Sequence, residues 1–102
     1  MTEKEMITKV VIETLAPLGV IRIAFFGSFV RQDFGPQSDV DILVWLPSLG
    51  KRKTIGLRWF SLDQEIEKKI GRTVDIVTES SINKFLRDQI KKDIEVIYEK
   101  AG

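Results

Sequence analysis

Residues 27–44, GSFVRQDFGPQSDVDILV, decide the fold of this chain. Gly27-Ser28 comes directly after residues 20–26, a β-branched and aromatic run that predicts a strand. The polar connection that follows contains Gly-Pro and has room for at most one helical turn. Residues 39–46 then predict a second strand, so the stretch predicts two strands joined by a sharp turn and a polar loop.

The segments on either side of these two strands have helical periodicity. In residues 3–16 the apolar positions recur every three or four residues, and Thr2 with Glu5 has the spacing of a capping box. A second helical stripe covers residues 54–70 and ends at Gly71. We therefore expect one helix before the first strand and another after the second.

The last third of the chain predicts a strand, a helix and one further short segment. Residues 72–78 predict a third strand, and Ser80 or Ser81 is suited to cap a helix that extends to Ile90. Residues 94–99 fit either a helix end or a strand, and we expect a short strand there.

The resulting order, α-β-turn-β-α-β-α-β, predicts an α+β domain with two layers (an α/β two-layer arrangement). Its small mixed sheet of three or four strands would be covered by helices, in a single domain over residues 1–102. The large aromatic side chains are expected in the core: Trp45, Trp59, Phe60 and Phe85.

Composition excludes several kinds of chemistry. The chain has no cysteine and no histidine, which rules out disulfides, Cys/His zinc sites, cysteine nucleophiles and a Ser-His-Asp triad. The net charge of +1 does not favour a nucleic-acid partner, and no apolar run is long enough to cross a membrane. The polar N-terminus is not a secretory signal, so we expect a cytoplasmic protein.

Three aspartates interrupt the strand patterns. Asp39 and Asp41 are two residues apart and so lie on one face of their strand, and Asp75 is the only charge in Thr73-Val-Asp-Ile-Val. Each has an ordinary interpretation: a loop position for Asp39, a strand end for Asp41, and a solvated face or an ion pair with Arg72 for Asp75.

Taken together, the three carboxylates favour a functional interpretation. At about 5 Å and an effective dielectric constant of 20, each pair of ionised carboxylates repels by roughly 3 kcal/mol. Such a group persists when a cation or protons neutralise it. Oxygen ligands without histidine or cysteine favour Mg²⁺ or Mn²⁺.

The turn at Gly27-Ser28 is the second candidate feature. A glycine directly after a strand lets the backbone approach a ligand, and the exposed amides of such a turn can hold phosphate. The pair by itself is equally an ordinary turn, and it is not a Walker A loop, because no Gly-Lys-Ser/Thr follows.

Together, Gly27-Ser28, ten intervening residues and Asp39-Val40-Asp41 resemble the nucleotidyltransferase signature of the DNA polymerase beta superfamily. The whole block resembles the minimal nucleotidyltransferase (MNT) family in particular, with Arg31 at the arginine of Gly-Ser-x-x-Arg and Asp75 at the third acid. The resemblance covers nearly the full chain. One departure is Gln32, where the family usually has glycine, which leaves the target of Arg31 open.

The resemblance implies a Mg²⁺-dependent transfer of a nucleotide from ATP. Asp39 and Asp41 would hold two Mg²⁺ ions, and Asp75 would complete the metal site and act as a possible base, so all three are candidate catalytic and metal-binding residues. Gly27 and Ser28 would grip the β and γ phosphates.

The resemblance also implies a partner. MNT proteins are typically encoded beside a HEPN-domain protein, and the pair acts as a toxin–antitoxin system in which the nucleotidyltransferase transfers AMP to a tyrosine of the HEPN toxin. Larger relatives hold their acceptor with a second domain, for which 102 residues leave no room. We therefore expect a hetero- or homo-oligomer.

Two other functions remain open at this point: an antitoxin that neutralises its partner by contact alone, and modification of nucleic-acid 3′ ends. The role of the basic cluster Lys51-Arg52-Lys53, with Arg58, is open as well. It is either a solvated loop or an anion contact near the triphosphate.

Overall fold

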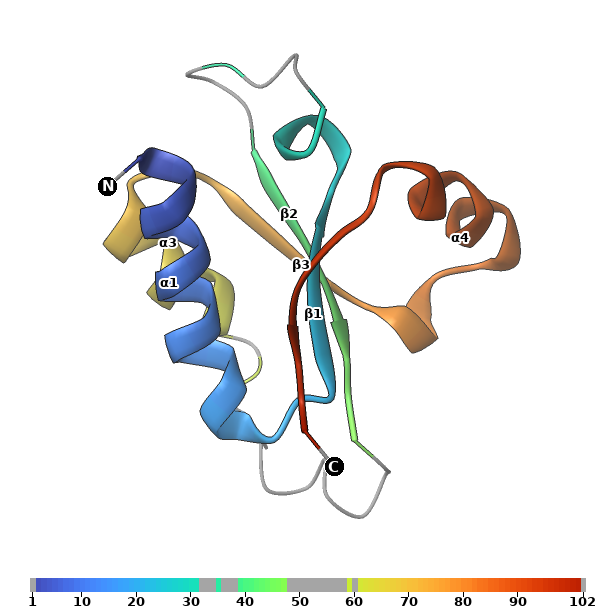
Figure 1. Ribbon diagram of the computed structural model, residues 1–102, viewed down its shortest axis with the longest axis horizontal. Helices are drawn as coiled ribbons and strands as arrows, with labels where there is room; N and C mark the ends of the chain where they lie inside the picture. The colour runs from blue at the N-terminus through green and yellow to red at the C-terminus, as the bar shows by residue number, and fades with distance from the viewer. Residues whose placement is uncertain (1, 32–34, 36–38, 48–58, 60, 102) are drawn as a thin grey trace.

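The computed structural model describes residues 2–31, 35, 39–47, 59 and 61–101 (Figure 1). These residues form three α-helices and four strands, with short 3₁₀ turns between them. In chain order the main elements are α1 (Glu3–Leu15), β1 (Arg22–Phe26), β2 (Val40–Trp45), α3 (Leu62–Ile70), β3 (Val74–Thr78), α4 (Lys84–Ile90) and β4 (Glu95–Glu99). This confirms the predicted fold class and the predicted order of elements.

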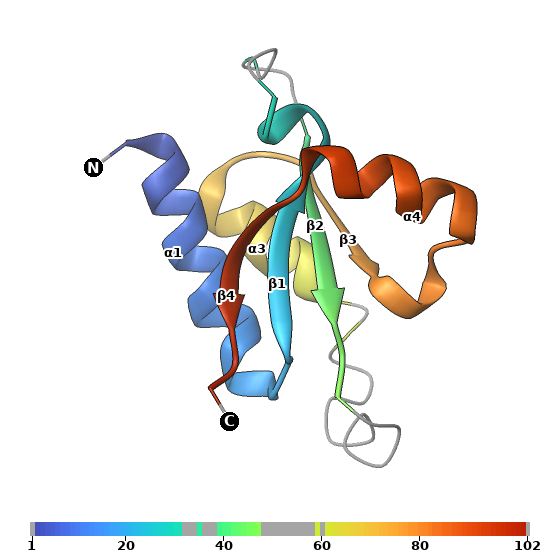
Figure 2. The ribbon, with the colours of Figure 1, turned by 45° about the vertical axis from the view of Figure 1, so that its right-hand side comes forward.

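The four strands form one mixed sheet in the order β3-β2-β1-β4 (Figure 2). β1 lies antiparallel to both of its neighbours, whereas β2 and β3 run parallel. The parallel pair needs a long crossover, and α3 lies within it. As a result the starts of β2 and β3 lie side by side at one end of the sheet.

Helices α1 and α3 cover one face of the sheet, and α4 lies on the other side (Figure 1). The core between the first two helices and the sheet consists of alternate strand residues and one stripe of each helix, as the predicted periodicities require. Its fully buried members include Ile7, Val11 and Leu15 from α1, Leu62 and Ile66 from α3, and Val40, Ile42 and Val44 from β2.

Local signals fix both ends of α1. The Thr2 hydroxyl accepts a hydrogen bond from the Glu5 amide at 3.1 Å, as the capping-box spacing predicts. A 3₁₀ turn over Ala16–Leu18 follows the helix, and Gly19 ends that turn with a positive φ. The short strand expected over residues 94–99 is also present, as β4.

The prediction for the last helix is wrong in two respects. Its cap is Asn83, whose side chain accepts from the Leu86 amide at 2.8 Å, while Ser80 and Ser81 lie in a preceding 3₁₀ turn. Phe85 is 70% exposed and not part of the core, because α4 packs loosely and has no buried residue.

Several expectations lie outside the described residues: the first part of the helix predicted over 54–70, the basic cluster 51–53 with Arg58, and Phe60. Trp45 and Trp59 are partly buried, and Trp59 packs against the core. None of the helices in the described ranges combines the length and the apolar character that a membrane crossing requires.

Candidate active site

The register of the sheet brings two of the three candidate aspartates together. Asp41 in β2 and Asp75 in β3 are direct partners across the parallel pair. Their neighbours Val40, Ile42 and Val74 are buried in the core, so the alternation of side chains places both carboxylates on the opposite face.

The third candidate, Asp39, lies one residue before β2 and is exposed. Its position two residues before Asp41 places it on the same side of the chain. The amide of Val40, between them, donates to the Thr73 carbonyl at 2.9 Å. This hydrogen bond ties the start of β2 to the segment that leads into Asp75.

The turn after β1 lies directly against Asp41. Phe26, the last residue of β1, is the partner of Asp41 in the antiparallel pair, and the chain then turns through a 3₁₀ turn over Gly27–Phe29. Gly27 has φ +72°, and a β-carbon there would overlap with the Asp41 Oδ2 atom and lie 3.4 Å from its Cγ. Only glycine fits between the turn and the carboxylate.

The turn itself is held by its own backbone. The amides of Val30 and Arg31 donate to the Gly27 carbonyl at 3.1 and 3.2 Å. Ser28 is partly buried within the turn. The candidate phosphate-binding pair therefore lies beside the candidate acidic site, although ten residues separate Ser28 from Asp39 in the sequence.

The electrostatic consequence of this arrangement appears at Asp41. Burial raises its pKa from 3.8 to about 6, and the negative charges of Asp75 and Asp39 add to this shift, while the positive charge of Arg31 opposes it. The site therefore gathers more negative charge than the neighbouring cation neutralises. An acidic group in this state favours a bound cation or a proton.

Arg31 stands at the edge of the site. Its Nη1 atom lies 3.6 Å from the Asp93 Oδ2 atom, in an ion pair whose two side chains are about half exposed. Asp93 belongs to the turn before β4, so the pair links the Gly-Ser turn to the last strand.

The donor set fits a hard divalent cation, because it consists of carboxylate oxygens without histidine or cysteine. The described part of the chain contains no group of three acidic side chains already placed to hold a metal ion. Magnesium is usually bound by one or two carboxylates, with waters and substrate phosphates completing its coordination. The pair Asp41 and Asp75 meets that requirement.

Arg72 supports the site and was not identified from the sequence. Its Nε and Nη2 atoms donate to the Glu3 carboxylate at 2.8 and 2.9 Å, and its Nη1 atom donates to the Gly35 carbonyl at 2.8 Å. Its side chain is only 12% exposed. One guanidinium thus joins the start of α1, the loop before Asp39 and the segment before Asp75.

No local pattern could have identified this role, because Glu3 and Gly35 are 69 and 37 residues away from Arg72. The alternative ion pair between Arg72 and Asp75 is absent from the described residues. Asp75 is exposed instead, and it borders a pocket of about 190 Å³ that Trp59, Asp63 and Ile76 also line.

Comparison with known proteins agrees with this geometry. The nucleotidyltransferase domain family matches residues 7–97. A protein of Methanocaldococcus jannaschii named as a protein adenylyltransferase is 37% identical over 84 residues, which cover 82% of this chain and 86% of that protein. The protein adenylyltransferase MntA of Thermococcus cleftensis is 36% identical over 79 residues, which cover 74% and 73% of the two chains.

Solved structures share the fold at lower sequence identity. A toxin–antitoxin complex with AMP-PNP contains a chain that aligns with a TM-score of 0.72 and 20% identity, over 91% of this chain and 73% of that one. A complex of the tri-AMPylated HEPN toxin of Shewanella oneidensis with its MNT antitoxin aligns with a TM-score of 0.67 and 19% identity, over 94% and 72%.

Proposed function

Because the chain belongs to the nucleotidyltransferase domain family, and within it to the MntA-like protein adenylyltransferases, we propose that it transfers AMP from ATP to a tyrosine hydroxyl of a HEPN-type toxin and thereby acts as the antitoxin. One observation carries the proposal: the backbone of the Gly27 turn lies against the Asp41 carboxylate, and Asp75 lies in register beside it. This is the arrangement that a triphosphate and an attacking hydroxyl require.

The structural neighbours support the choice of nucleotide and acceptor. One is a toxin–antitoxin complex with the ATP analogue AMP-PNP, and another contains an AMPylated HEPN toxin bound to its antitoxin. For the present chain, ATP as the donor and a HEPN protein as the acceptor are inferences from that fold and from the family.

The residues of the turn bind the donor. The backbone amides of Gly27 and Ser28 and the Ser28 hydroxyl are donors suited to the β and γ phosphates. The absence of a side chain at Gly27 lets those phosphates approach the acidic residues. Arg31 supplies positive charge at the edge of the site, in a position to compensate part of the triphosphate charge.

The three aspartates bind the cations, and one of them also acts on the acceptor hydroxyl. Asp39, Asp41 and Asp75 would hold two Mg²⁺ ions, which neutralise the triphosphate and favour ionisation of the acceptor hydroxyl when they are bound; Mn²⁺ suits the same ligands. Asp75 is exposed, so it can meet an incoming tyrosine and accept its proton.

The transfer of AMP is an in-line displacement at the α-phosphorus of ATP. The tyrosine oxygen forms a bond to the α-phosphorus of ATP, the bond from that phosphorus to the bridging oxygen breaks, and pyrophosphate leaves. The proton of the tyrosine passes to Asp75 and then to solvent. The chain needs no histidine for this reaction, in accordance with its composition.

The test combines the purified chain, ATP, Mg²⁺ and a HEPN-domain candidate partner, and reads the partner by intact-protein mass spectrometry. We expect an added AMP on the partner, and none with Asp41→Asn. The matched control is Asp88→Asn, which removes an exposed carboxylate of α4 far from the turn.

The same experiment separates the two antitoxin mechanisms. If Asp41→Asn still neutralises the toxin while no AMP is transferred, the chain acts by contact and the enzymatic proposal is wrong. Labelling of an RNA pool in place of the protein would instead favour modification of nucleic-acid ends.

A further inference from the structure

A second cavity lies on the same face of the sheet as the aspartates, but at the opposite end of β2. It has a volume of about 210 Å³ and is enclosed between α4, its flanking turns and the strands β1 and β2. Its charged lining residues are Arg22, Glu79, Arg87 and Lys91. Trp45, Leu43 and three isoleucine side chains form the rest of the wall.

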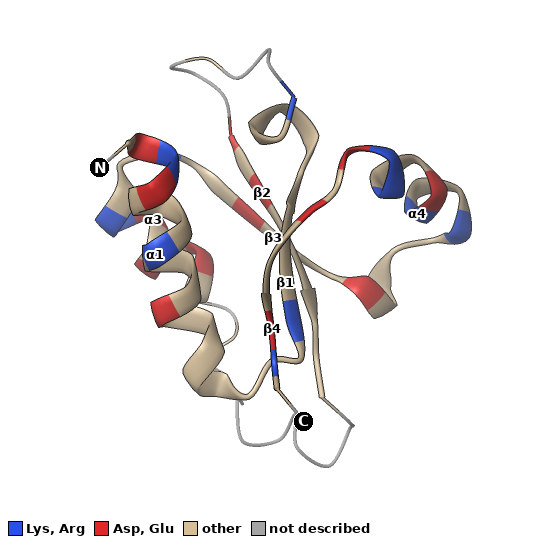
Figure 3. Cartoon of the chain, in the orientation of Figure 1, with Lys and Arg blue, Asp and Glu red and all other residues tan. Residues whose placement is uncertain are grey.

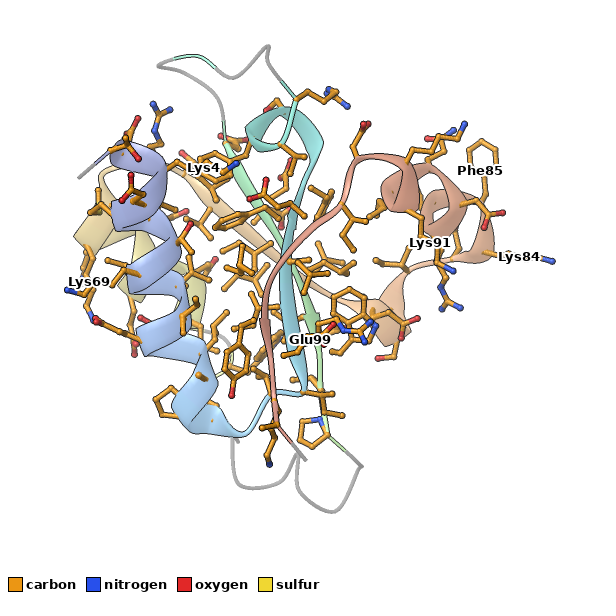
Figure 4. The ribbon with its side chains drawn as sticks, in the orientation of Figure 1. Lys4, Lys69, Lys84, Phe85, Lys91 and Glu99 are labelled. Atoms are coloured by element: carbon orange, nitrogen blue, oxygen red, sulfur yellow. The ribbon has the colours of Figure 1, made fainter. Side chains whose placement is uncertain are left out.

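The cavity exists because α4 does not pack closely against the sheet. The helix has no buried residue, and two of its large apolar side chains, Phe85 and Leu86, are 70% and 46% exposed. In Figure 4 Lys84 and Phe85 point away from the sheet, while Lys91 lies nearer to it. Space therefore remains between the helix and the strands.

The charges around this space are mostly positive. Three cations and one acid line the cavity, and the acid, Glu79, lies 3.4 Å from the Arg87 Nε atom. Arg22 pairs with Glu99, at 3.1 Å, which is not one of the lining residues. Lys91 has no ion pair within the described part of the chain. Because Glu99 and Glu79 pair with the two arginines, the excess of positive charge at the cavity comes from Lys91.

Two donors in its walls are only partly satisfied. The buried Nε atoms of Arg22 and Arg87 lie 3.1 and 3.4 Å from the carboxylates of Glu99 and Glu79, but neither contact has the alignment of a hydrogen bond. Buried donors normally find an acceptor, and an unsatisfied one costs stability. A ligand with oxygen acceptors would satisfy them.

The remaining wall suits a flat apolar group. The Arg22 guanidinium lies over the Trp45 ring, 5.1 Å from its centroid, and aliphatic side chains close the other sides. The volume is below the range of about 300–1,000 Å³ that drug-sized ligands occupy. A fragment-sized molecule fits these dimensions, whereas a folded peptide segment does not.

We propose that this cavity binds a small organic anion: a compact aromatic or aliphatic body that carries one carboxylate or phosphate group. The body packs between Trp45 and the aliphatic wall, and the anionic group accepts from the cations of β1 and α4. The site is separate from the acidic one and does not depend on nucleotide transfer.

Binding is measured by the fluorescence of Trp45 in a Trp59→Phe background, so that one tryptophan reports. The probes are benzoate and phenyl phosphate, with neutral benzamide and cationic benzylamine as isosteric controls. We expect the two anions to bind with a Kd of about 1 mM, as small ligands of this size do. We expect benzamide and benzylamine to bind at least tenfold more weakly.

A matched pair of variants locates the site. Lys91→Gln should weaken benzoate binding about five- to tenfold, whereas Lys84→Gln, on the outer side of the same helix, should leave it unchanged. Asp41→Asn should also leave it unchanged, which keeps this result independent of the transferase activity. Equal binding of benzoate and benzamide, or equal effects of the two lysine variants, would overturn the proposal.

The two anionic probes distinguish the sources of such a ligand. Tighter binding of phenyl phosphate indicates a phosphorylated metabolite, and tighter binding of benzoate indicates a carboxylic acid. Chemical-shift changes confined to residues 43–45 and 87–94 support the site, and changes confined to residues 26–31 contradict it.

Discussion

On one face of the sheet, the charges beside the two ends of β2 have opposite signs: aspartates lie at its start, and Arg22 of the neighbouring strand lies at its end. Near its start, Asp41 is paired with Phe26 in β1 and with Asp75 in β3; at its other end, Trp45 is paired with Arg22. The two positions are four residues apart along the strand, which corresponds to about 13 Å. Figure 3 shows the acidic positions on β2 and β3 toward one end of the sheet and a basic position at the far end of β1.

The two regions differ in how they are assembled. The acidic end combines a short motif with a strand register, and a glycine turn packs against its central carboxylate. The basic end is formed by Arg22 of β1, residues of β2, and the segment 79–94 that contains α4 and the turns around it, and these three segments are far apart in sequence. The acidic region can therefore be identified from a short sequence motif, whereas the basic region is formed only by the packing of α4 against the sheet.

The largest effect is expected when the acidic end loses its central charge. Asp41→Asn keeps the shape of the side chain but removes a carboxylate, and we expect AMP transfer to fall by about 100- to 1,000-fold, the usual cost of losing one charge-stabilising group. Initial rates of transfer to the HEPN partner measure this. A loss of less than about tenfold would mean that Asp41 is not part of the catalytic machinery.

The close approach of the turn to Asp41 is tested with two glycines of similar backbone conformation. Gly27→Ala meets both an unfavourable φ of +72° and the Asp41 carboxylate, whereas Gly71→Ala, at φ +75°, has no atom within 4 Å of the added carbon. We expect Gly71→Ala to destabilise by about 1 kcal/mol and Gly27→Ala by about 3 kcal/mol.

Urea unfolding gives both values. The Gly27 variant should in addition lose binding of an ATP analogue, while the Gly71 variant retains it. Equal destabilisation by the two substitutions would show that the turn does not press on the carboxylate in solution.

The support beneath the acidic end is tested with Arg72→Lys. The substitution keeps the charge but cannot reproduce the paired bonds to Glu3 together with the bond to the Gly35 carbonyl. We expect the Tm to fall by about 5 °C. We also expect KM for ATP to rise, because the loop before Asp39 loses an anchor.

Arg87→Lys serves as the control for the substitution itself, since Arg87 pairs with Glu79 near the end of β2 that lies away from Asp41. It should leave KM unchanged. If both variants alter KM alike, Arg72 has no special relation to the acidic site.

The pH dependence of stability reports the raised pKa of Asp41, which burial and then the charges of Asp75 and Asp39 cause. Its pKa is raised to about 6 in the folded protein, from 3.8, so the folded state holds this proton more tightly than the unfolded chain. The free energy of unfolding, measured without divalent cations, should therefore decrease as the pH rises from about 4 to 6 and then stop changing on this account.

Because Asp41 is only half-buried, solvent screening reduces the full effect of this shift to about 1 kcal/mol. Asp41→Asn should remove this part of the pH dependence and stabilise the protein at pH 7. Wild-type and variant curves of the same shape would show that the pKa of Asp41 is not raised in the folded protein.

The smallest effect is expected at the edge of the site. Asp93→Asn removes the partner of Arg31, but the ion pair is half-exposed and its atoms are 3.6 Å apart. We expect a loss of no more than about 0.5 kcal/mol in urea unfolding. We also expect no decrease in AMP transfer, since the triphosphate is an alternative partner for Arg31. A large loss of activity would give Asp93 a role in the site.

The elements that the sequence predicted correctly have strong local signals. The cap of α1, the glycine after α3 and the strand alternation around Asp41 each depend on residues within one or two turns of each other. The start of α4 was predicted wrongly, because Ser80 and Ser81 belong to a separate 3₁₀ turn and the side chain of Asn83, which was not considered, caps the helix.

By itself, the sequence determined the α+β fold, the order of its elements and the residue types available for chemistry. The spacing from Gly27-Ser28 to Asp39 and Asp41 and the period of two in a strand are properties of the chain alone. The absence of histidine and cysteine likewise limits the chemistry to carboxylates, hydroxyls and cations.

Only the tertiary structure decided which of these residues meet. It placed Asp75 beside Asp41 and Gly27 against the Asp41 carboxylate. It also brought Arg72 within hydrogen-bond distance of the Glu3 carboxylate and the Gly35 carbonyl. It also left a basic cavity beneath α4. The physical reason is that strand register and helix packing bring together residues far apart in sequence, and the energy that selects those contacts comes from the whole core.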